Sequence, residues 1–324
     1  MVGPTAAAFG ERARALARFK TSDVGFEYAT KAAAVVVLAS LVGVMVVLAM
    51  GAWPAFREFG ASFFVTDVWS PPKEKFGAAS AIVGTLVTAF IAILIAVPVG
   101  LGVAVFLTEL CPPVARRPVG IAIELLAGVP SIIYGIWGVF FLRPVMQAYV
   151  EPFLISTLGA VPGIGFLFAG PPLGYGILTA GLVLAIMILP YIAAVSRDVF
   201  DTVPSLLKEA AYGIGATTSE VVGSIIIPYT RGGLVGGVML ALGRALGETM
   251  AVTFVIGNNT KLPTSLLAQG TTISAMIANQ FGDADPGLHT SSLLALGFIL
   301  FMITFVVLAA ARLMLARMQA QAGR

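Results

Sequence analysis

The sequence predicts an all-α polytopic membrane protein with six transmembrane helices. Of its 324 residues, 58% are hydrophobic and only 11% are charged, and the mean hydropathy is +0.98. These values lie far outside the range of soluble globular domains. Crossing a hydrocarbon core of about 30 Å takes roughly 20 helical residues, and six apolar segments are that long. They lie near residues 32–52, 77–108, 119–142, 174–196, 229–257 and 291–316.

The six segments predict one membrane domain, residues 32–316, between two short ends. Residues 1–31 are a charged N-terminal segment, expected either as an amphipathic helix on the membrane surface or as a disordered tail. Residues 317–324 form a short C-terminal tail. The first apolar run has about 21 residues, which is too long for the usual cleaved signal peptide. We therefore expect it to remain as the first span.

The distribution of Lys and Arg between the loops predicts how the chain crosses the membrane. With the amino terminus inside, thirteen basic residues fall on the cytoplasmic side and five on the opposite side, while Arg244 lies within a span. The positive-inside rule then places both termini in the cytoplasm. The cytoplasmic set is Arg12, Arg14, Arg18, Lys20, Lys31, Arg116, Arg117, Arg197, Lys208, Arg231, Arg312, Arg317 and Arg324, and the opposite set is Arg57, Lys73, Lys75, Arg143 and Lys261.

Composition also excludes several classes of function. The net charge is only +3 and the basic residues are dispersed, so no nucleic-acid-binding surface is expected. One cysteine, Cys111, and one histidine, His289, exclude an intramolecular disulfide and a histidine-based metal cluster or catalytic triad. We expect Cys111 to be a loop or interfacial thiol and His289 a solvated loop residue. No GxxxxGKS or GxxxxGKT motif occurs, so we assign no nucleotide site, no catalytic residue and no metal ligand.

A polar segment, residues 204–228, separates the fourth and fifth apolar runs. Its positive-inside placement puts it in the cytoplasm. Pro suits the first turn of a helix, Gly suits a helix end, and Thr or Ser suits an N-cap, so we expect two short helices at an angle. The expected markers are Pro204 in the first turn, Gly213 and Gly215 at the stop, Thr217, Thr218 or Ser219 as the second cap, and Pro228 at the second end.

The same segment resembles the EAA loop of ABC-importer permeases, which forms the coupling helices that dock onto the ATPase subunit. The resemblance implies that Glu209, Ala210, Ala211 and Gly215 serve ATPase coupling. Ile227 stands where the family usually has Leu, a conservative departure. The alternative is an ordinary amphipathic connector. The matching pattern is Glu209-Ala210-Ala211, three residues, Gly215, nine residues, and then Ile225-Ile226-Ile227-Pro228.

The fifth apolar run carries two opposite charges, Arg244 and Glu248, four residues apart. On a continuous helix they share one stripe. If the helix begins near Tyr229, Arg244 lies roughly 22 Å along it at 1.5 Å per residue. An arginine at the bilayer centre costs about 2.5–3.5 kcal/mol on insertion scales, so the stripe should face protein or water. One interpretation is a neutralised ion pair that holds helices together; the favoured one is a polar station on a translocation path, because a guanidinium offers a planar fork of donors to an oxyanion.

Small residues follow a neighbouring stripe of the same run. Gly236, Leu240, Gly243 and Gly247 are spaced by four, three and four residues and therefore share one face. Glycine at such positions allows another helix to approach closely. We therefore predict a packing seam through Gly236, Gly243 and Gly247 beside the charged stripe.

Three motifs extend the resemblance over roughly residues 30–316 and make it specific. Together they resemble the PstC-type permease subunit of the phosphate ABC importer. In that family the positions of Arg244 and Glu248 are implicated in phosphate passage. The motifs are Leu240-Ala241-Leu242-Gly243-Arg244-Ala245-Leu246-Gly247-Glu248-Thr249-Met250-Ala251-Val252, Gly128-Val129-Pro130-Ser131-Ile132-Ile133-Tyr134-Gly135-Ile136-Trp137-Gly138, and Ile186-Met187-Ile188-Leu189-Pro190-Tyr191.

The resemblance implies an ABC type I importer permease fold with cytoplasmic coupling helices in the bacterial cytoplasmic (inner) membrane. It implies a non-enzymatic transport subunit that moves inorganic phosphate by alternating access and holds no cofactor itself. The implied partners are a PstA-type second permease, a dimer of PstB-type ATPases with ATP and Mg²⁺, a PstS-type phosphate-binding protein, and membrane lipid. The alternatives are a sulfate or molybdate permease, or a stand-alone ion-coupled anion transporter or channel. A membrane enzyme is disfavoured because the spans carry no plausible nucleophile, base or metal constellation.

Overall fold

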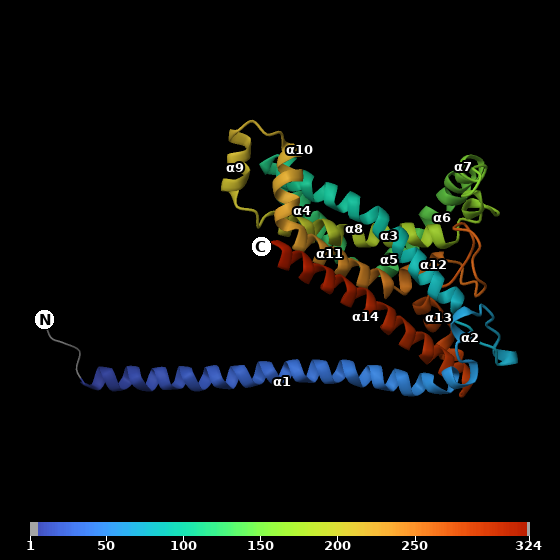
Figure 1. Ribbon diagram of the computed structural model, residues 1–324, viewed down its shortest axis with the longest axis horizontal. Helices are drawn as coiled ribbons and strands as arrows, with labels where there is room; N and C mark the ends of the chain where they lie inside the picture. The colour runs from blue at the N-terminus through green and yellow to red at the C-terminus, as the bar shows by residue number, and fades with distance from the viewer. Residues whose placement is uncertain (1–5, 323–324) are drawn as a thin grey trace. The chain divides into compact units, whose positions relative to one another are not determined.

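The computed structural model describes residues 6–322 of the chain, and the side chains of residues 23–317. This part of the chain is helical, with short connections and two isolated bridge pairs, Ser70 with Lys75 and Gly257 with Gly270 (Figure 1). Six of its helices are long and apolar enough to cross a membrane. They span Asp23–Phe59, Ala79–Leu110, Ser131–Thr157, Ile177–Phe200, Thr218–Leu246 and Leu288–Arg317.

The chain divides into two units, Met1–Gly51 and Ala52–Arg324, and each is described by itself. The first unit contains most of helix α1, Ala6–Phe59. Its described side chains include a long run of exposed apolar residues, as expected of a helix with lipid around it. The predicted boundary at residue 31 lies inside this helix, and the boundary at residue 316 lies inside α14, Leu288–Ala322. Both boundaries stay predictions.

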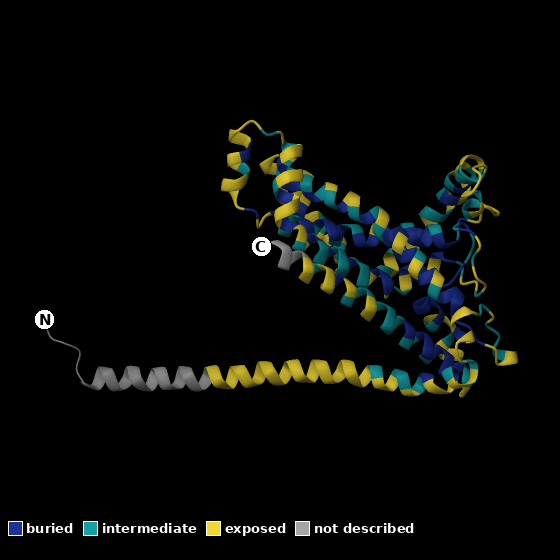
Figure 2. Ribbon diagram, in the orientation of Figure 1, coloured by how far each residue is buried: buried dark blue, intermediate teal, exposed yellow. Residues whose placement is uncertain are grey.

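The second unit is built around α8, Ile177–Phe200, which is the most buried of the six spans (Figure 2). Against it pack α3, Ala79–Val105, and α11, Ile227–Leu246, while α14, Leu288–Ala322, packs on α11. The largest apolar cluster joins α3, α8, α11 and α12, Met250–Val255, with Leu184, Ile188 and Val255 fully buried. A lipid-exposed bundle gains little from hydrophobic burial, so close packing of this kind holds its helices together.

Glycines show the relative directions of the central helices. A Cβ at Gly181 would lie 2.7 Å from Ile91, and a Cβ at Gly100 would lie 2.8 Å from Ile192, so α3 and α8 run in the same direction. A Cβ at Gly233 would meet Val199 and one at Gly237 would meet Val195, so α11 runs antiparallel to α8. These directions agree with a chain that crosses the bilayer at each of the six spans.

The third predicted span, 119–142, is wrong in its placement. Helix α4, Pro113–Ala127, ends at Gly128, and a new helix begins at Ser131 and continues to Thr157 through two π-helical turns. The reason is local, because Pro130 supplies no N–H and disfavours a helical conformation at the residue before it. This second helix comprises α5, Ser131–Trp137, α6, Arg143–Val145, and α7, Glu151–Thr157.

The fifth predicted span, 229–257, is displaced in the same way. It begins earlier, at α10, Thr218–Val221, continues through a π-helical turn into α11, and ends at Leu246. Pro228 was predicted to end the second short helix, and this is wrong. The proline lies directly after the π-helical turn, inside the continuous Thr218–Leu246 helix, and the helix does not end there.

The two single-copy residues Cys111 and His289 are both buried. Cys111 is only 5% exposed, directly after the π-helical turn that ends α3. His289 is 9% exposed at the start of α14 and stacks on Phe76 with ring centroids 5.2 Å apart. The expectation of a solvated loop histidine is therefore wrong. Near His289, α14 packs against α13, Ile273–Gln280. A second apolar cluster lies in the same region and includes Phe63 of α2, Ser62–Val65.

Candidate functional site

The helix that carries Arg244 ends two residues after it, at Leu246. Gly247 follows the end of α11, Glu248 and Thr249 are not helical, and α12, Met250–Val255, starts afresh. The expected continuous stripe of Arg244 and Glu248 is therefore wrong. Glycine is a poor helix former, and the carboxylate of Glu248 gives the new helix an acceptor, since Oε1 accepts a hydrogen bond from the Ala251 N–H at 3.2 Å.

No ion pair joins the described side chains of Arg244 and Glu248. The guanidinium of Arg244 is exposed in this chain, whereas Glu248 is partly buried beside the start of α12. The two residues are separated by a change of backbone direction, and each has its own environment. The N–H groups of the Arg244 guanidinium are therefore not bound to the Glu248 carboxylate, although the two residues are close in the sequence.

A second break lies beside the first. It is the interruption between α4 and α5, which the Tyr134 hydroxyl bridges by donating a 2.9 Å hydrogen bond to the Leu126 carbonyl. A Cβ at Gly135 would lie 3.1 Å from the Ala251 Cα, so the start of α5 packs tightly on the start of α12. Arg244 lies in the last turn of α11, directly before the first break. The two breaks and the arginine thus belong to one site.

Paired helix breaks have a recognised use in membrane transport proteins. Non-helical backbone at membrane depth is tolerated where it is buried in protein or lines a cavity, because lipid satisfies no hydrogen bonds. Transporters place such discontinuous helices around substrate sites. An unpaired guanidinium at the junction presents several N–H donors in a plane, which is the geometry that binds a tetrahedral oxyanion. This arrangement of donors is chemically suited to an anion.

The predicted packing seam of α11 meets open space in this chain. A Cβ at Gly236 would have no neighbour within 4 Å, one at Gly243 would meet Leu308 at an ordinary 3.8 Å, and one at Gly247 would touch only its own helix. The close approach of another helix along Gly236, Gly243 and Gly247 stays a prediction. The close contacts are made by other glycines, which the sequence reasoning missed, although a Gly pair four residues apart was a usable signal. A Cβ at Gly233 or Gly237 would lie 2.7 Å from Val199 or Val195 of α8.

The segment that resembles a coupling loop protrudes from one end of the second unit (Figure 1). Helix α9, Ser205–Gly213, is followed by Gly215, whose φ of +92° is a left-handed conformation that glycine adopts without strain. Thr217 and Glu220 then form a capping box at the start of α10, as the expected Thr cap requires. The sharp turn predicted at these glycines is confirmed.

The four predicted coupling residues have different environments. Glu209 and Ala210 are exposed, and Gly215 is exposed at the turn. Ala211 is 8% exposed and belongs to an apolar cluster with the ends of α3 and α8. The turn also presents Ile214, which is 88% exposed. One face of the loop is thus anchored in the bundle, and the other is exposed (Figure 2).

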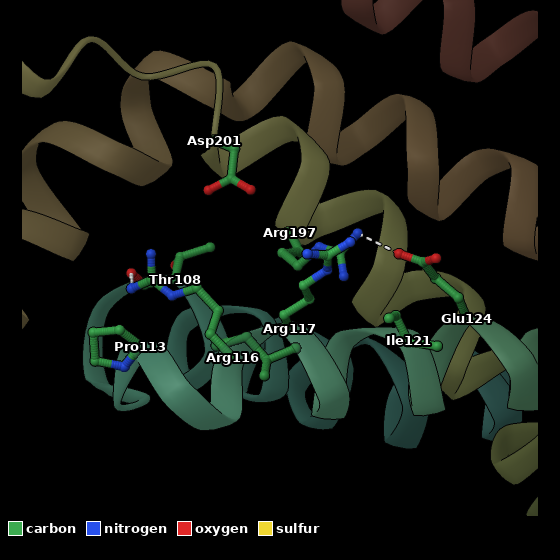
Figure 3. Close-up of a pocket in the computed structure, with 9 residues that line it drawn as sticks. Thr108, Pro113, Arg116, Arg117, Ile121, Glu124, Arg197 and Asp201 are labelled. Atoms are coloured by element: carbon green, nitrogen blue, oxygen red, sulfur yellow. Dashed lines mark hydrogen bonds and ion pairs between the residues drawn. The ribbon is translucent and has the colours of Figure 1, made fainter.

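Near the same end, α4 and α8 enclose a polar pocket of about 340 Å³. Arg197 of α8 donates to Glu124 of α4 at 2.6 Å and to Asp198 at 2.8 Å. Figure 3 shows Arg116 and Arg117 reaching from α4 toward the same space. Glu124 is the ion-pair partner that ties α4 to α8.

The fold is that of an ABC type I importer permease. It resembles a chain of a bacterial ABC transporter involved in the import of the acidic polysaccharide alginate, with a TM-score of 0.56 and 19% identity over 83% of this chain and 88% of that chain. A second alginate ABC transporter structure, in complex with an alginate-bound periplasmic protein, gives a TM-score of 0.56 and 17% identity over 87% of this chain and 94% of that chain. At these identities the likeness establishes the fold alone.

The chain belongs to the family described as "Binding-protein-dependent transport system inner membrane component", which its residues 96–320 match. It is 60% identical to the phosphate transport system permease protein PstC of Mesorhizobium japonicum, over 94% of each chain. It is 54% identical to PstC of Pasteurella multocida over 92% of this chain and 93% of that one. The probable PstC of Methanocaldococcus jannaschii is 42% identical over 79% and 82% of the two chains.

Proposed function

We propose that this chain is the PstC-type permease subunit of an ATP-driven importer of inorganic phosphate. The observation that carries the proposal is the 60% identity, over nearly the whole chain, to a phosphate transport system permease protein. The unpaired guanidinium of Arg244 between two helix breaks supports it, since that chemistry suits an oxyanion. Phosphate passes the level of Arg244 and Glu248 as the site opens alternately to the two sides of the membrane.

In this proposal the α9 end faces the cytoplasm, together with both termini, as the distribution of basic residues favours. A PstB-type ATPase dimer, with its ATP and Mg²⁺, binds the exposed surface of α9 and the turn at Ile214. A PstA-type permease completes the pathway, and a PstS-type binding protein delivers phosphate to the opposite end. The chain itself carries no cofactor and performs no covalent chemistry.

An energy source is a physical requirement of such uptake. Moving one negative charge inward against an inside-negative potential costs about 2.3 kcal/mol per 100 mV. ATP hydrolysis can supply this free energy only if the closing movement of the ATPase dimer is transmitted to the permease. The α9 to α10 segment is the part of this chain suited to that contact, because it protrudes, is stiffened by a capping box and is anchored through Ala211.

The test is reconstitution of the complex that co-purifies with this chain in mild detergent. Proteoliposomes should take up radiolabelled phosphate only with internal ATP and external binding protein, and excess sulfate or molybdate should not compete. Vesicles that contain the purified chain alone should be inactive. Uptake by the chain alone would favour a stand-alone transporter, and competition by sulfate would favour the other oxyanion permease.

A further inference from the structure

A buried ion pair joins the docking helix α9 to the end of α3. Nζ of Lys208 lies 2.7 Å from Oε1 of Glu109, although the two residues are 99 positions apart in the sequence. The side chains are 18% and 7% exposed. Among the ion pairs of the described side chains, this is the one in which both partners are largely withdrawn from water.

Burial makes this pair a strong geometric constraint. Separating two charges that have lost their water leaves an uncompensated charge, so removing one partner of such a pair is strongly destabilising. An exposed pair of the same length contributes little, because water screens it. Lys208 therefore follows Glu109 when either helix moves, and α9 has little freedom to shift on its own.

Apolar packing surrounds the pair but does not fix its direction. Ala211 of α9 packs in a cluster with Ala104 of α3 and Phe200 of α8. Small apolar surfaces of this kind attract without directional preference and allow sliding. The ion pair adds the direction, since it ties one point of α9 to one point of α3.

Glu109 lies in an unusual piece of backbone. The turn that continues α3, Phe106–Leu110, is π-helical, a rare form that is frequent at functional positions. The same turn is held from another side, because the Arg116 guanidinium of α4 donates to the Thr108 carbonyl (Figure 3). Both α9, through Lys208, and α4, through Arg116, therefore bind this turn.

From there α4 leads directly to the anion site. Its far end is the break at Gly128, where the Tyr134 hydroxyl donates to the Leu126 carbonyl and Gly135 packs against Ala251 of α12, just after the break that follows Arg244. A chain of packed and hydrogen-bonded groups thus runs from α9 through Glu109, the π-helical turn and α4 to the break beside Arg244. Spatial continuity alone does not demonstrate coupling, so the link needs a direct test.

We propose that Lys208 and Glu109 are positioning residues that transmit the movement of the docking helix α9 to α3 and α4, and so couple ATP hydrolysis to opening of the anion site. The inference rests on the proposed function, because it assumes that α9 carries the ATPase. It goes beyond that function by assigning the transmission step to two residues outside the pattern that resembles the EAA loop. Neither residue touches phosphate.

The experiment uses the complete complex, with three variants of the pair. Glu109→Gln with Lys208→Met removes both charges and so leaves no unpaired buried charge. Glu109→Lys with Lys208→Glu reverses the pair, and Lys208→Arg conserves it. The matched control is Glu27→Gln with Lys31→Met, which removes the exposed 2.5 Å pair of α1. For each complex, phosphate uptake and ATP hydrolysis are measured in the same proteoliposomes.

The proposal predicts that the neutral pair retains the ATPase subunit and hydrolyses ATP, but transports at least about fivefold less phosphate per ATP, within the range of typical coupling energies. The reversed pair and Lys208→Arg recover the wild-type ratio, and the control is unchanged. A wild-type ratio in the neutral pair overturns the proposal, and so does loss of the ATPase subunit from it, which would make the pair a structural tie. If the wild-type complex itself contains no ATPase, the proposed function fails instead.

Discussion

The carboxylate of Glu248 accepts the backbone N–H of Ala251 at 3.2 Å, and so caps the first turn of α12 instead of neutralising Arg244. The sequence places the two charges four residues apart, yet the backbone turns between them at Gly247. Glu248 is thereby given a structural task that an uncharged acceptor can also perform. This relationship separates the roles of the two residues, and it sets the first prediction.

Glu248→Gln should retain the cap, because the amide oxygen accepts the same hydrogen bond, whereas Glu248→Ala should lose it. The loss of a helix cap typically costs about 1 kcal/mol. Thermal unfolding of the purified complex should therefore show a lower Tm for Glu248→Ala than for Glu248→Gln. Equal Tm values for the two variants would show that the cap contributes nothing to stability.

Gly215 and Gly213 form a matched pair for testing the docking turn. Both lie in open space, with no neighbour within 4 Å of an added Cβ, but only Gly215 has a positive φ, of +92°. A left-handed conformation costs an L-residue about 1–2 kcal/mol. Gly215→Val should distort the turn and reduce co-purification of the ATPase, while Gly213→Val should have little effect. The prediction fails if both variants retain the ATPase equally.

Gly237 and Gly236 distinguish packing within the chain from packing between chains. A Cβ at Gly237 would lie 2.7 Å from Val195, whereas one at Gly236 meets nothing. Gly237→Leu should therefore overpack the contact with α8 and destabilise the purified chain by about 1–3 kcal/mol. Gly236→Leu should leave the Tm of the chain unchanged and instead reduce recovery of the second permease, if the predicted seam contacts that subunit. Unchanged recovery of the second permease with Gly236→Leu would show that the predicted seam does not contact that subunit.

Membrane orientation is open to direct chemical labelling. Cysteines at Ser219 and Lys261, both exposed, are introduced into a Cys111→Ser background. An impermeant thiol reagent should label position 261 from outside intact cells and position 219 only after the membrane is opened. Labelling of both positions from one side would contradict the proposed topology.

Hydropathy predicted the number of spans because the bilayer sets their length, and it predicted their approximate places. Hydropathy could not place the breaks at Gly128 and Gly247. The apolar run continues across each break, whereas the helical backbone hydrogen bonds are interrupted there. The Pro130 that ends α4 was visible in the sequence and could have been used. The turn at Gly215 was predicted from local chemistry, since a positive φ and a following Thr cap depend on neighbouring residues alone.

Long-range pairing was beyond the reach of the sequence. Nothing in the local pattern joins Lys208 to Glu109, and the pair emerges only when α9 folds back on the end of α3. His289 was misjudged for the same reason, since its stacking on Phe76 depends on a contact between distant segments. Arg244 was found because a charge in an apolar run is conspicuous, but its environment depends on the second break beside Tyr134.

The central claim is that Arg244 binds phosphate during passage, and uptake by Arg244 variants tests it most directly. Radiolabelled phosphate uptake, normalised to assembled complex, is measured for Arg244→Gln, Arg244→Lys, and Arg244→Gln combined with Glu248→Gln. The account predicts loss of uptake in Arg244→Gln with assembly intact, partial recovery in Arg244→Lys because an ammonium lacks the planar fork, and no recovery in the double variant. Full uptake in the double variant would contradict the account, since it would show that Arg244 serves only to balance Glu248.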